Sequence, residues 1–370
     1  MPEGAGRSVG VSEGDATLRS VRPALKAGLR PVWRDRETVQ IGIDPRRAVA
    51  LTGIGDAAVV IGLLDGSRDR DQLIATAREQ GIPAAVTDRI LTLLATGGVL
   101  DDLPAATLGS LSQVQRARLR AELATAALAR GHSDAGAAAL ARRDGASVQI
   151  YGPGRVAVAL ADILSTSGVG RVTTCDEVRI PDLDATPPAT PSQHATSARG
   201  SQAPVPAGPA QMNGSGPAGG WRRGGQPALP DLAVLVGYQQ PELIAWLMRA
   251  GAAHLAVWAE EAIGIVGPMV APGRTSCLRC LHLTRAGLDP AWPLILAQLV
   301  GRSADPPACD AALAAAVAGQ AAIQALAFVD RDTEHAPAEN GTLELELPGW
   351  QWRRRTWPPH PRCGCTRVPV

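Results

Sequence analysis

The chain has 370 residues, and its 36 basic and 35 acidic side chains leave a formal charge of +1. This length exceeds what one hydrophobic core usually organises, so we expect two or three domains. The balanced charge argues against a protein whose main partner is nucleic acid. The start, MPEGAGRSVG, lacks the basic and apolar runs of a signal peptide, so we expect a cytoplasmic protein.

The first hundred residues alternate short strand and helix patterns. Residues 1–20 are rich in Gly and Ser and are expected to be disordered. The segment Pro31–Gly53 predicts two short strands joined by a turn at Asp44-Pro45. Three helices are predicted next, over Asp56–Leu64, Arg70–Glu79 with Asp69 as its N-cap, and Pro83–Ala95. We therefore predict a small winged-helix α+β domain over residues 21–103.

Winged helices often bind DNA, so the charge of this segment matters. Residues 21–102 hold eleven Lys or Arg and eleven Asp or Glu. A neutral domain of this kind is better suited to a protein or a peptide than to a DNA groove.

A βαβ pattern follows a helical stretch that begins near Leu111. We expect strands at Ser147–Tyr151 and Arg171–Cys175, with a helix between them that ends near Ser167. The turn after the first strand reads GPGRVA, and Asp176 directly follows the second strand. This order of elements predicts a Rossmann-like sheet.

The glycine-rich turn is a candidate nucleotide site. Gly152 permits a tight turn, and Gly154 lets a phosphate approach the backbone at the start of the helix. Asp176 lies where an acidic residue can bond a ribose hydroxyl. Arg155 is bulky beside the phosphate path, so the motif alone leaves nucleotide binding open.

The middle of the chain contains an insertion and then further sheet elements. Residues 181–230 are Pro, Gly, Ser, Thr, Ala and Gln with hardly any large apolar residue, and we expect them to be disordered. Three more strands and a helix are predicted, at Asp231–Val236, His254–Trp258, Ile263–Val270 and Pro241–Ala250. The apolar run Ala308–Val329 is mostly alanine with Asp310 and two glutamines, which favours a buried helix over a membrane span.

A hairpin is predicted near the C-terminus, with strands Thr342–Leu347 and Trp350–Thr356 around Pro348-Gly349. In this register Glu344 faces Arg353. The opposite face is expected to carry the apolar side chains Leu343, Leu345, Leu347, Trp350 and Trp352. The three consecutive arginines are then better explained by cross-strand pairing than by nucleic-acid binding.

Four of the six cysteines form two close pairs. Cys277 and Cys280 stand in CLRC, and Cys363 and Cys365 stand in CGC. Two such pairs offer four thiolates for one tetrahedral zinc ion with no position left for a substrate, which predicts a structural site. Reduced buried cysteines or a redox pair are the alternatives. For Cys309 we expect a buried thiol rather than a thioester nucleophile.

The order of these parts resembles the ThiF/MoeB family, adenylyltransferases related to ubiquitin-activating enzymes. The resemblance runs from Leu111 to the C-terminus, over residues 111–370, and rests on GPGRVA at 152–157, GPMVAPGRTSCLRC at 267–280 and RCGC at 362–365. The N-terminal segment is similar to the PqqD-like winged-helix domains that bind leader peptides. Together they resemble actinobacterial ThiF-like proteins. The resemblance implies an α/β fold with a C-terminal zinc knuckle and a homodimer.

The family's chemistry is attack by a carboxylate on the α-phosphate of ATP, assisted by Mg²⁺. Family members carry an arginine stretch and a lysine after the second strand. Here only Arg179 is close by, and the single lysine, Lys26, lies in the other domain. Tyr238 stands at or next to the place of the family's magnesium-binding acid, and a phenol is a poor replacement on a hard cation. The resemblance therefore implies a degenerate ATP site, with no catalytic residue assigned.

Three functions follow as hypotheses. The first is a scaffold that binds a precursor peptide and presents it to a cyclodehydratase-like partner enzyme, using, by analogy of fold, the sheet edge at Thr38–Ile43 and the helix at Val86–Leu94. A structural role explains these positions equally well. The second is an active adenylyltransferase that relies on Arg155 and Asp176. The third, a regulator that binds DNA, is disfavoured by the charge count.

Overall fold

A computed structural model provides the structure. It describes residues 22–103, 112–175, 229–300, 308–332 and 337–366. The chain forms two compact units. The first contains the described residues up to Ala146 together with Ile163–Arg171 and Val329–Arg331. The second contains Ser147–Asp162, Val172–Phe328 and the residues from Asp332 onward.

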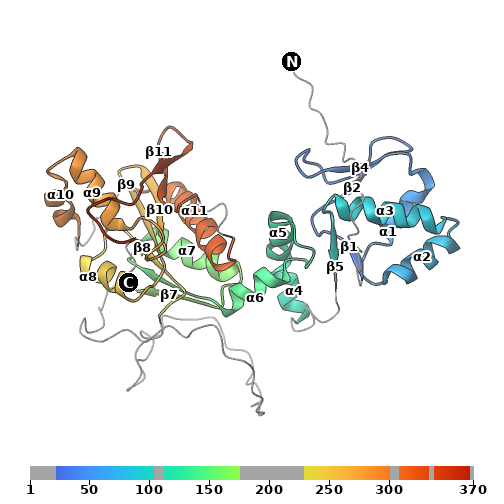
Figure 1. The fold of residues 1–370 in the computed structure, drawn as a ribbon, viewed down its shortest axis with the longest axis horizontal. Coiled ribbons are helices and arrows are strands. Elements are labelled where there is room, and N and C mark those ends of the chain that lie inside the picture. Colours follow the sequence, from blue (N-terminus) through green and yellow to red (C-terminus); the bar gives the residue numbers. More distant parts are fainter. Residues whose placement is uncertain (1–21, 104–111, 176–228, 301–307, 333–336, 367–370) are drawn as a thin grey trace, which may run out of the picture. The chain divides into compact units, whose positions relative to one another are not determined.

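The first unit has two small antiparallel sheets (Figure 1). Their strands are β2 (Pro31–Trp33), β3 (Val39–Ile41) and β4 (Val49–Leu51) in one sheet, and β1 (Pro23–Leu25) and β5 (Leu100–Asp102) in the other. The predicted turn at Asp44 joins β3 to β4. Since β3 pairs with both β2 and β4, the predicted free edge at Thr38–Ile43 is wrong. Among the residues that the structure describes, β2 and β4 form the free edges of this sheet.

Helices pack on these strands much as predicted. They are η1 (Gly55–Ala58), α1 (Val59–Gly62), α2 (Arg70–Glu79) and α3 (Ala84–Thr96). Asp69 begins α2 with a capping box, because its side chain accepts from the Gln72 N–H at 2.8 Å and its N–H donates to the Gln72 side chain at 3.1 Å. Their apolar faces meet the sheet in one core that includes Ile41, Leu73 and Leu94.

The chain's single lysine is a structural residue. Lys26 is 1% exposed, and its Nζ lies 2.6 Å from an Asp101 carboxylate oxygen. The ammonium also donates to the His132 carbonyl. Burial raises the pKa of Asp101, and the adjacent Lys26 opposes this rise. The ion pair therefore joins β1 to β5 inside the first unit.

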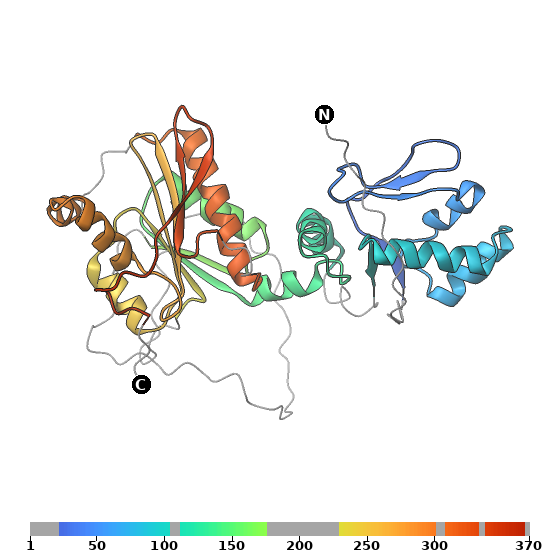
Figure 2. The same cartoon turned by 45° about the horizontal axis from the view of Figure 1, so that its top comes forward.

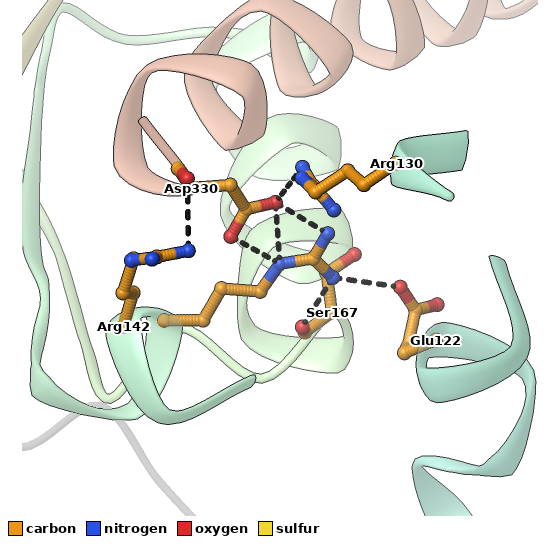
Figure 3. Close-up of polar contacts among 6 residues, drawn as sticks. Glu122, Arg130, Arg142, Ser167 and Asp330 are labelled. Atoms are coloured by element: carbon orange, nitrogen blue, oxygen red, sulfur yellow. Dashed lines mark hydrogen bonds and ion pairs between the residues drawn. The ribbon is translucent and has the colours of Figure 1, made fainter. Parts of the chain in front are cut away.

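Three further helices complete the first unit. They are α4 (Gln113–Arg118), α5 (Arg120–Arg130) and α6 (Ala137–Gly145). Figure 3 shows Asp330 between Arg130 and Arg142, with Glu122 and Ser167 nearby.

The Asp330 carboxylate holds α5 and α6 together. Asp330 is 2% exposed, and Arg143 donates to its oxygens from Nε at 3.0 and 3.1 Å and from Nη2 at 2.8 Å. Arg130 forms a second ion pair with the same carboxylate. Arg143 also donates to Glu122 and to the Ser167 carbonyl, each at 3.2 Å.

The second unit is built on a seven-stranded sheet in the order β12-β11-β10-β9-β8-β6-β7. The strands are β6 (Ser147–Tyr151), β7 (Arg171–Cys175), β8 (Leu232–Val236), β9 (His254–Glu260), β10 (Ile263–Val270), β11 (Gly341–Glu346) and β12 (Trp352–Thr356). Strands β6, β8 and β9 are parallel, and β9 to β12 are antiparallel. This large mixed sheet confirms the predicted α/β class.

Helices cover both faces of the large sheet (Figure 2). They are α7 (Arg155–Thr166), α8 (Pro241–Arg249), α9 (Leu278–Leu288), α10 (Trp292–Leu299) and α11 (Ala311–Val329). Figure 2 shows α7 and α11 on one face and α8 and α9 on the other. By length and composition alone α11 is apolar enough to cross a membrane, but half of its apolar window is buried within the structure. Its Val317 packs against Gly264 of β10.

The C-terminal hairpin has the predicted register, with Glu344 opposite Arg353 and Leu345 opposite Trp352. Leu343 and Leu345 are buried as expected. Trp350 is not on that apolar face, because it lies in the connection between β11 and β12 and is 74% exposed.

Candidate metal centre, glycine loop and apolar cavity

The four predicted cysteines come together in the second unit. Their Sγ atoms all lie within 4.8 Å of one another. Cys277 Sγ is 3.9 Å from Cys280 Sγ and 3.5 Å from Cys363 Sγ, and Cys280 Sγ is 3.3 Å from Cys365 Sγ. A tetrahedral zinc with Zn–S bonds near 2.3 Å places its sulfurs about 3.8 Å apart. The group therefore has the dimensions to hold zinc.

Local backbone geometry brings the second pair into place. Gly364 has φ +73°, in the left-handed region that glycine adopts without strain, and this turn lets both neighbouring cysteines face the same point. The His360 N–H lies 3.2 Å from Cys280 Sγ and can donate to a thiolate there. A single-residue spacer thus suffices for Cys363 and Cys365.

Burial makes two of these four sulfurs, those of Cys277 and Cys365, poor anions by themselves. It raises the pKa of Cys277 well above its ordinary value and that of Cys365 to about 11. A cation bound among the sulfurs would offset the cost of burying negative charge, so the thiols would lose their protons. The donor set and its burial therefore fit a closed four-thiolate site.

Three of the four predicted nucleotide residues lie around the turn between β6 and α7. Gly152 and Gly154 have φ +109° and +103°. A Cβ on Gly152 would lie 2.2 Å from the Val236 carbonyl oxygen, whereas a Cβ on Gly154 would meet no atom within 4 Å. Arg155 is exposed at the first position of α7. Asp176 lies outside the described residues.

Gln239, which no sequence pattern indicated, closes part of this turn. Its Nε2 donates to the Val236 carbonyl at 2.6 Å and lies 3.5 Å from the Tyr151 carbonyl. The Gly152 N–H donates to the Cys175 carbonyl at 3.0 Å. The Gln239 side-chain amide and the Gly152 N–H, at the carboxyl ends of β8 and β6, are thus already hydrogen-bonded within the protein.

Tyr238 lies just after β8, as expected. Its ring centroid is 5.8 Å from that of Trp258, and burial raises the pKa of the phenol. A neutral phenol is not a ligand that Mg²⁺ prefers.

Cys309 is half-buried, and not fully buried as predicted. Burial raises the pKa of its thiol, the neighbouring Asp310 raises it further, and Arg155 opposes the rise. A thiol with a raised pKa is a weak nucleophile at neutral pH.

An apolar cavity of about 530 Å³ lies beside Tyr238, between the sheet and α8, α9 and α10. Among its lining residues are Leu235, Ile244, Met248, Trp258, Leu278 and Leu296. Trp258 is 7% exposed, and its indole Nε1 has no hydrogen-bond partner within the described part of the chain. An unmet buried donor of this kind costs about 1–3 kcal/mol.

A separate open groove of about 1040 Å³ lies in the first unit. Trp33, Ile54, Pro83 and Val86 are among its lining residues. Trp33 is 59% exposed and Val86 37%, so apolar surface faces solvent next to the strand ends. Val86 lies in the helix expected from the sequence to contact a peptide, whereas no sequence pattern indicated Trp33.

Solved structures of other proteins have a similar fold. No family model matches the chain, and no curated protein matches its sequence. The structure is similar to that of E. coli MccB with AMPCPP and MccA, at TM-score 0.60 and 14% identity over 94% of this chain and 100% of that one. The complex of E. coli MccB with ATP matches at TM-score 0.58 and 13% identity, over 93% and 99%.

Heterocyclases are similar as well. The heterocyclase TruD matches at TM-score 0.59 and 16% identity over 93% of this chain and 42% of that one. A heterocyclase solved with substrate and cofactor matches equally well, over 93% and 39%. This chain thus spans about two fifths of the heterocyclase chains that it resembles. At these identities the likeness concerns the fold, and it supports the ThiF-like fold expected from the sequence.

Proposed function

We propose that this protein binds a precursor peptide through its leader segment and presents it to a partner enzyme of the cyclodehydratase type. The observation that carries the proposal is the free edge of β4 beside α3 in the first unit. Gly97, just after α3, packs against Val49 of β4. Val86 and Leu93 on the same helix are 37% and 42% exposed. An extended peptide can add to such an edge by main-chain hydrogen bonds while its apolar side chains pack on the helix.

The similar structures support a role in peptide modification. E. coli MccB has been solved with MccA and named as a microcin C7 biosynthetic enzyme. A similar heterocyclase has been solved with its substrate. These are properties of those proteins, and for this chain we propose from them only that it binds a peptide.

We further infer that the nucleotide site is degenerate. Gln239 occupies hydrogen-bonding positions next to Gly152, and Tyr238 provides a neutral phenol where the family resemblance implies an acid. Lys26 is buried in an ion pair in the first unit and is not available to a triphosphate. The partner enzyme would then carry out the chemistry.

The test uses the full chain and a fluorescently labelled precursor peptide, whose binding is measured by anisotropy. We expect binding that Leu93→Glu weakens by about tenfold or more, because a carboxylate would be buried against an apolar side chain. Ala75→Glu adds the same charge to an exposed position of α2 and serves as the control. Equal weakening by both substitutions, or by neither, would contradict the proposed edge.

An active adenylyltransferase is the second candidate. It is favoured by the two left-handed glycines and the open space at Gly154, which suit a phosphate. Calorimetry with ATP and Mg²⁺ separates the two functions, since the scaffold predicts no heat of binding. ATP-dependent pyrophosphate exchange in the presence of the peptide would refute the scaffold and support the adenylyltransferase.

We also propose that Cys277, Cys280, Cys363 and Cys365 hold one structural zinc ion, because their spacing and burial suit four Zn–S bonds. Elemental analysis of the purified protein should find zinc near one equivalent per chain. The family resemblance further implies a homodimer, and sedimentation measures its mass.

A further inference from the structure

The open groove of the first unit combines apolar surface with an excess of negative charge. Its volume of about 1040 Å³ is as large as the larger ligand sites of proteins, so it can hold several residues of a peptide. Its exposed or half-buried apolar side chains are those of Trp33, Ile54 and Val86. The charged residues of the described lining are three acids and one arginine, Asp35, Glu37, Asp56 and Arg36. A groove of this charge attracts cations and disfavours anions.

Two of these carboxylates are not used within the described part of the protein. A Cβ on Gly55 would lie 3.0 Å from Glu37 Oε2, so the Glu37 carboxylate lies against the backbone that leads into Asp56. Neither Glu37 nor Asp56 forms an ion pair with a residue that the structure describes. Asp35 is used locally, because its carboxylate accepts the Glu37 N–H at 2.8 Å. Glu37 and Asp56 therefore remain to pair with positive charge on a ligand.

The groove lies at the carboxyl end of the β4 edge. Gly53 and Ile54 line it and come just after β4, and Val86 lines it from the first half of α3. At the other end of α3, Gly97 packs against Val49 at the start of β4. α3 thus runs past β4 in the opposite direction, and its beginning is the part that borders the groove. A peptide strand added to the β4 edge would therefore continue into the groove at one of its two ends.

We propose that this groove binds the part of the precursor peptide that flanks the added strand, and that this part carries an apolar side chain next to arginine or lysine. The apolar side chain packs against Trp33 and Val86, and the cations face Glu37 and Asp56. The exposed Trp33 ring can itself attract a cation. This inference rests on the proposed function, because it assumes that a peptide strand adds at β4.

Fluorescence anisotropy with labelled synthetic peptides tests the charge on the full chain. Each probe has a strand segment of alternating Val and Thr, flanked by either Gly-Leu-Arg-Arg or Gly-Leu-Glu-Glu. Each flank is placed at the amino or at the carboxyl terminus of the segment, so both strand directions are sampled. We expect the arginine flank to bind about tenfold more tightly than the glutamate flank at one terminus, because it pairs with two carboxylates. Equal affinity for the two flanks at both termini, or a preference for glutamate, overturns the proposal.

Substitutions locate the cation in the groove. Glu37→Arg changes an exposed residue, so the fold should tolerate it, and it should reverse the preference from the arginine flank to the glutamate flank. Glu79→Arg makes the same change at an exposed position of α2 outside the lining and should keep the preference. Trp33→Ala should weaken binding of the arginine probe, whereas Trp350→Ala, exposed in the second unit, should not. An arginine preference that survives Glu37→Arg would place the cation elsewhere and refute the assignment.

The Leu93→Glu variant separates this inference from the proposed function. If it weakens every probe while the two flanks bind equally to the unsubstituted chain, the groove assignment fails and the β4 edge stands. If it weakens no probe while the arginine preference follows Glu37, the β4 edge fails and the groove keeps its class of ligand. Weakening of every probe together with an arginine preference that Glu37→Arg reverses supports both.

Discussion

Replacing Asp330 by Asn tests how strongly one carboxylate holds the first unit together. The substitution keeps the shape of the side chain and removes its charge. Arg143 and Arg130, with side chains only 7% and 11% exposed, then lose the negative charge and one of the two acceptor oxygens (Figure 3). Removing one partner from a buried ion pair costs about 3–5 kcal/mol, because the remaining charge is left buried without compensation.

The loss should be seen within the first unit itself. A destabilisation of this size lowers the midpoint of thermal unfolding by roughly 2–4 °C per kcal/mol in a domain of this size, or about 6–20 °C in all. Hydrogen exchange read by mass spectrometry follows α5 and α6 directly, so unfolding of the second unit does not obscure the result.

Asp88→Asn is the matched control, because Asp88 pairs with Arg70 and both side chains are 44% exposed. An exposed pair contributes about 0–1 kcal/mol, so α2 and α3 should keep their protection. If Asp330→Asn changed the free energy of opening by no more than this control, the buried pair would not be holding the helices, and the reasoning would fail.

Three further outcomes are expected. Cys365→Ser should reduce zinc content from about one equivalent to near zero by elemental analysis, because three thiolates leave the tetrahedral site incomplete, while Cys309→Ser keeps the metal. Burial lowers the pKa of His254 to about 4. The stability that depends on a neutral His254 is therefore fully present above the unfolded pKa of 6.5, and it is lost as pH falls towards 4 because only the unfolded state then binds a proton. In urea unfolding, His254 should lower the free energy of unfolding by about 2 kcal/mol between pH 7 and pH 5, and the His254→Gln variant should not show this decrease. Gly152→Ala should destabilise the protein by more than Gly154→Ala in the same urea assay, since only the first Cβ meets a carbonyl oxygen, at 2.2 Å.

Strands of ordinary length were predictable from the sequence, and some of the three-residue strands were not. β6, β7 and β10 have the expected boundaries because glycines or charged turns bound each apolar run. β1, β2 and β5 have three residues each, which is too short for an alternating pattern. Missing β2 had a consequence, because β3 was then taken for a free edge.

The functional elements divide in the same way. Cys277 and Cys280 were readable because thiolate pairs have a characteristic local spacing. The position of Gln239 was not, because its role depends on β6 and β8 lying side by side although they are distant in the chain. The apolar cavity likewise depends on how α8, α9 and α10 pack on the sheet, which no local pattern records.

The geometry around the glycine turn limits how this protein could use ATP. The Gly152 N–H is bonded to Cys175, and the Gln239 amide is bonded to strand carbonyls. A phosphate would thus have to approach through Gly154, where space is open, and Arg155 is the exposed cation beside it. One guanidinium can orient a phosphate, but the family's reaction also requires a magnesium ion, held by carboxylates, to neutralise the leaving pyrophosphate. The described part of this site thus offers a phosphate one open approach, at Gly154, and one exposed cation, Arg155.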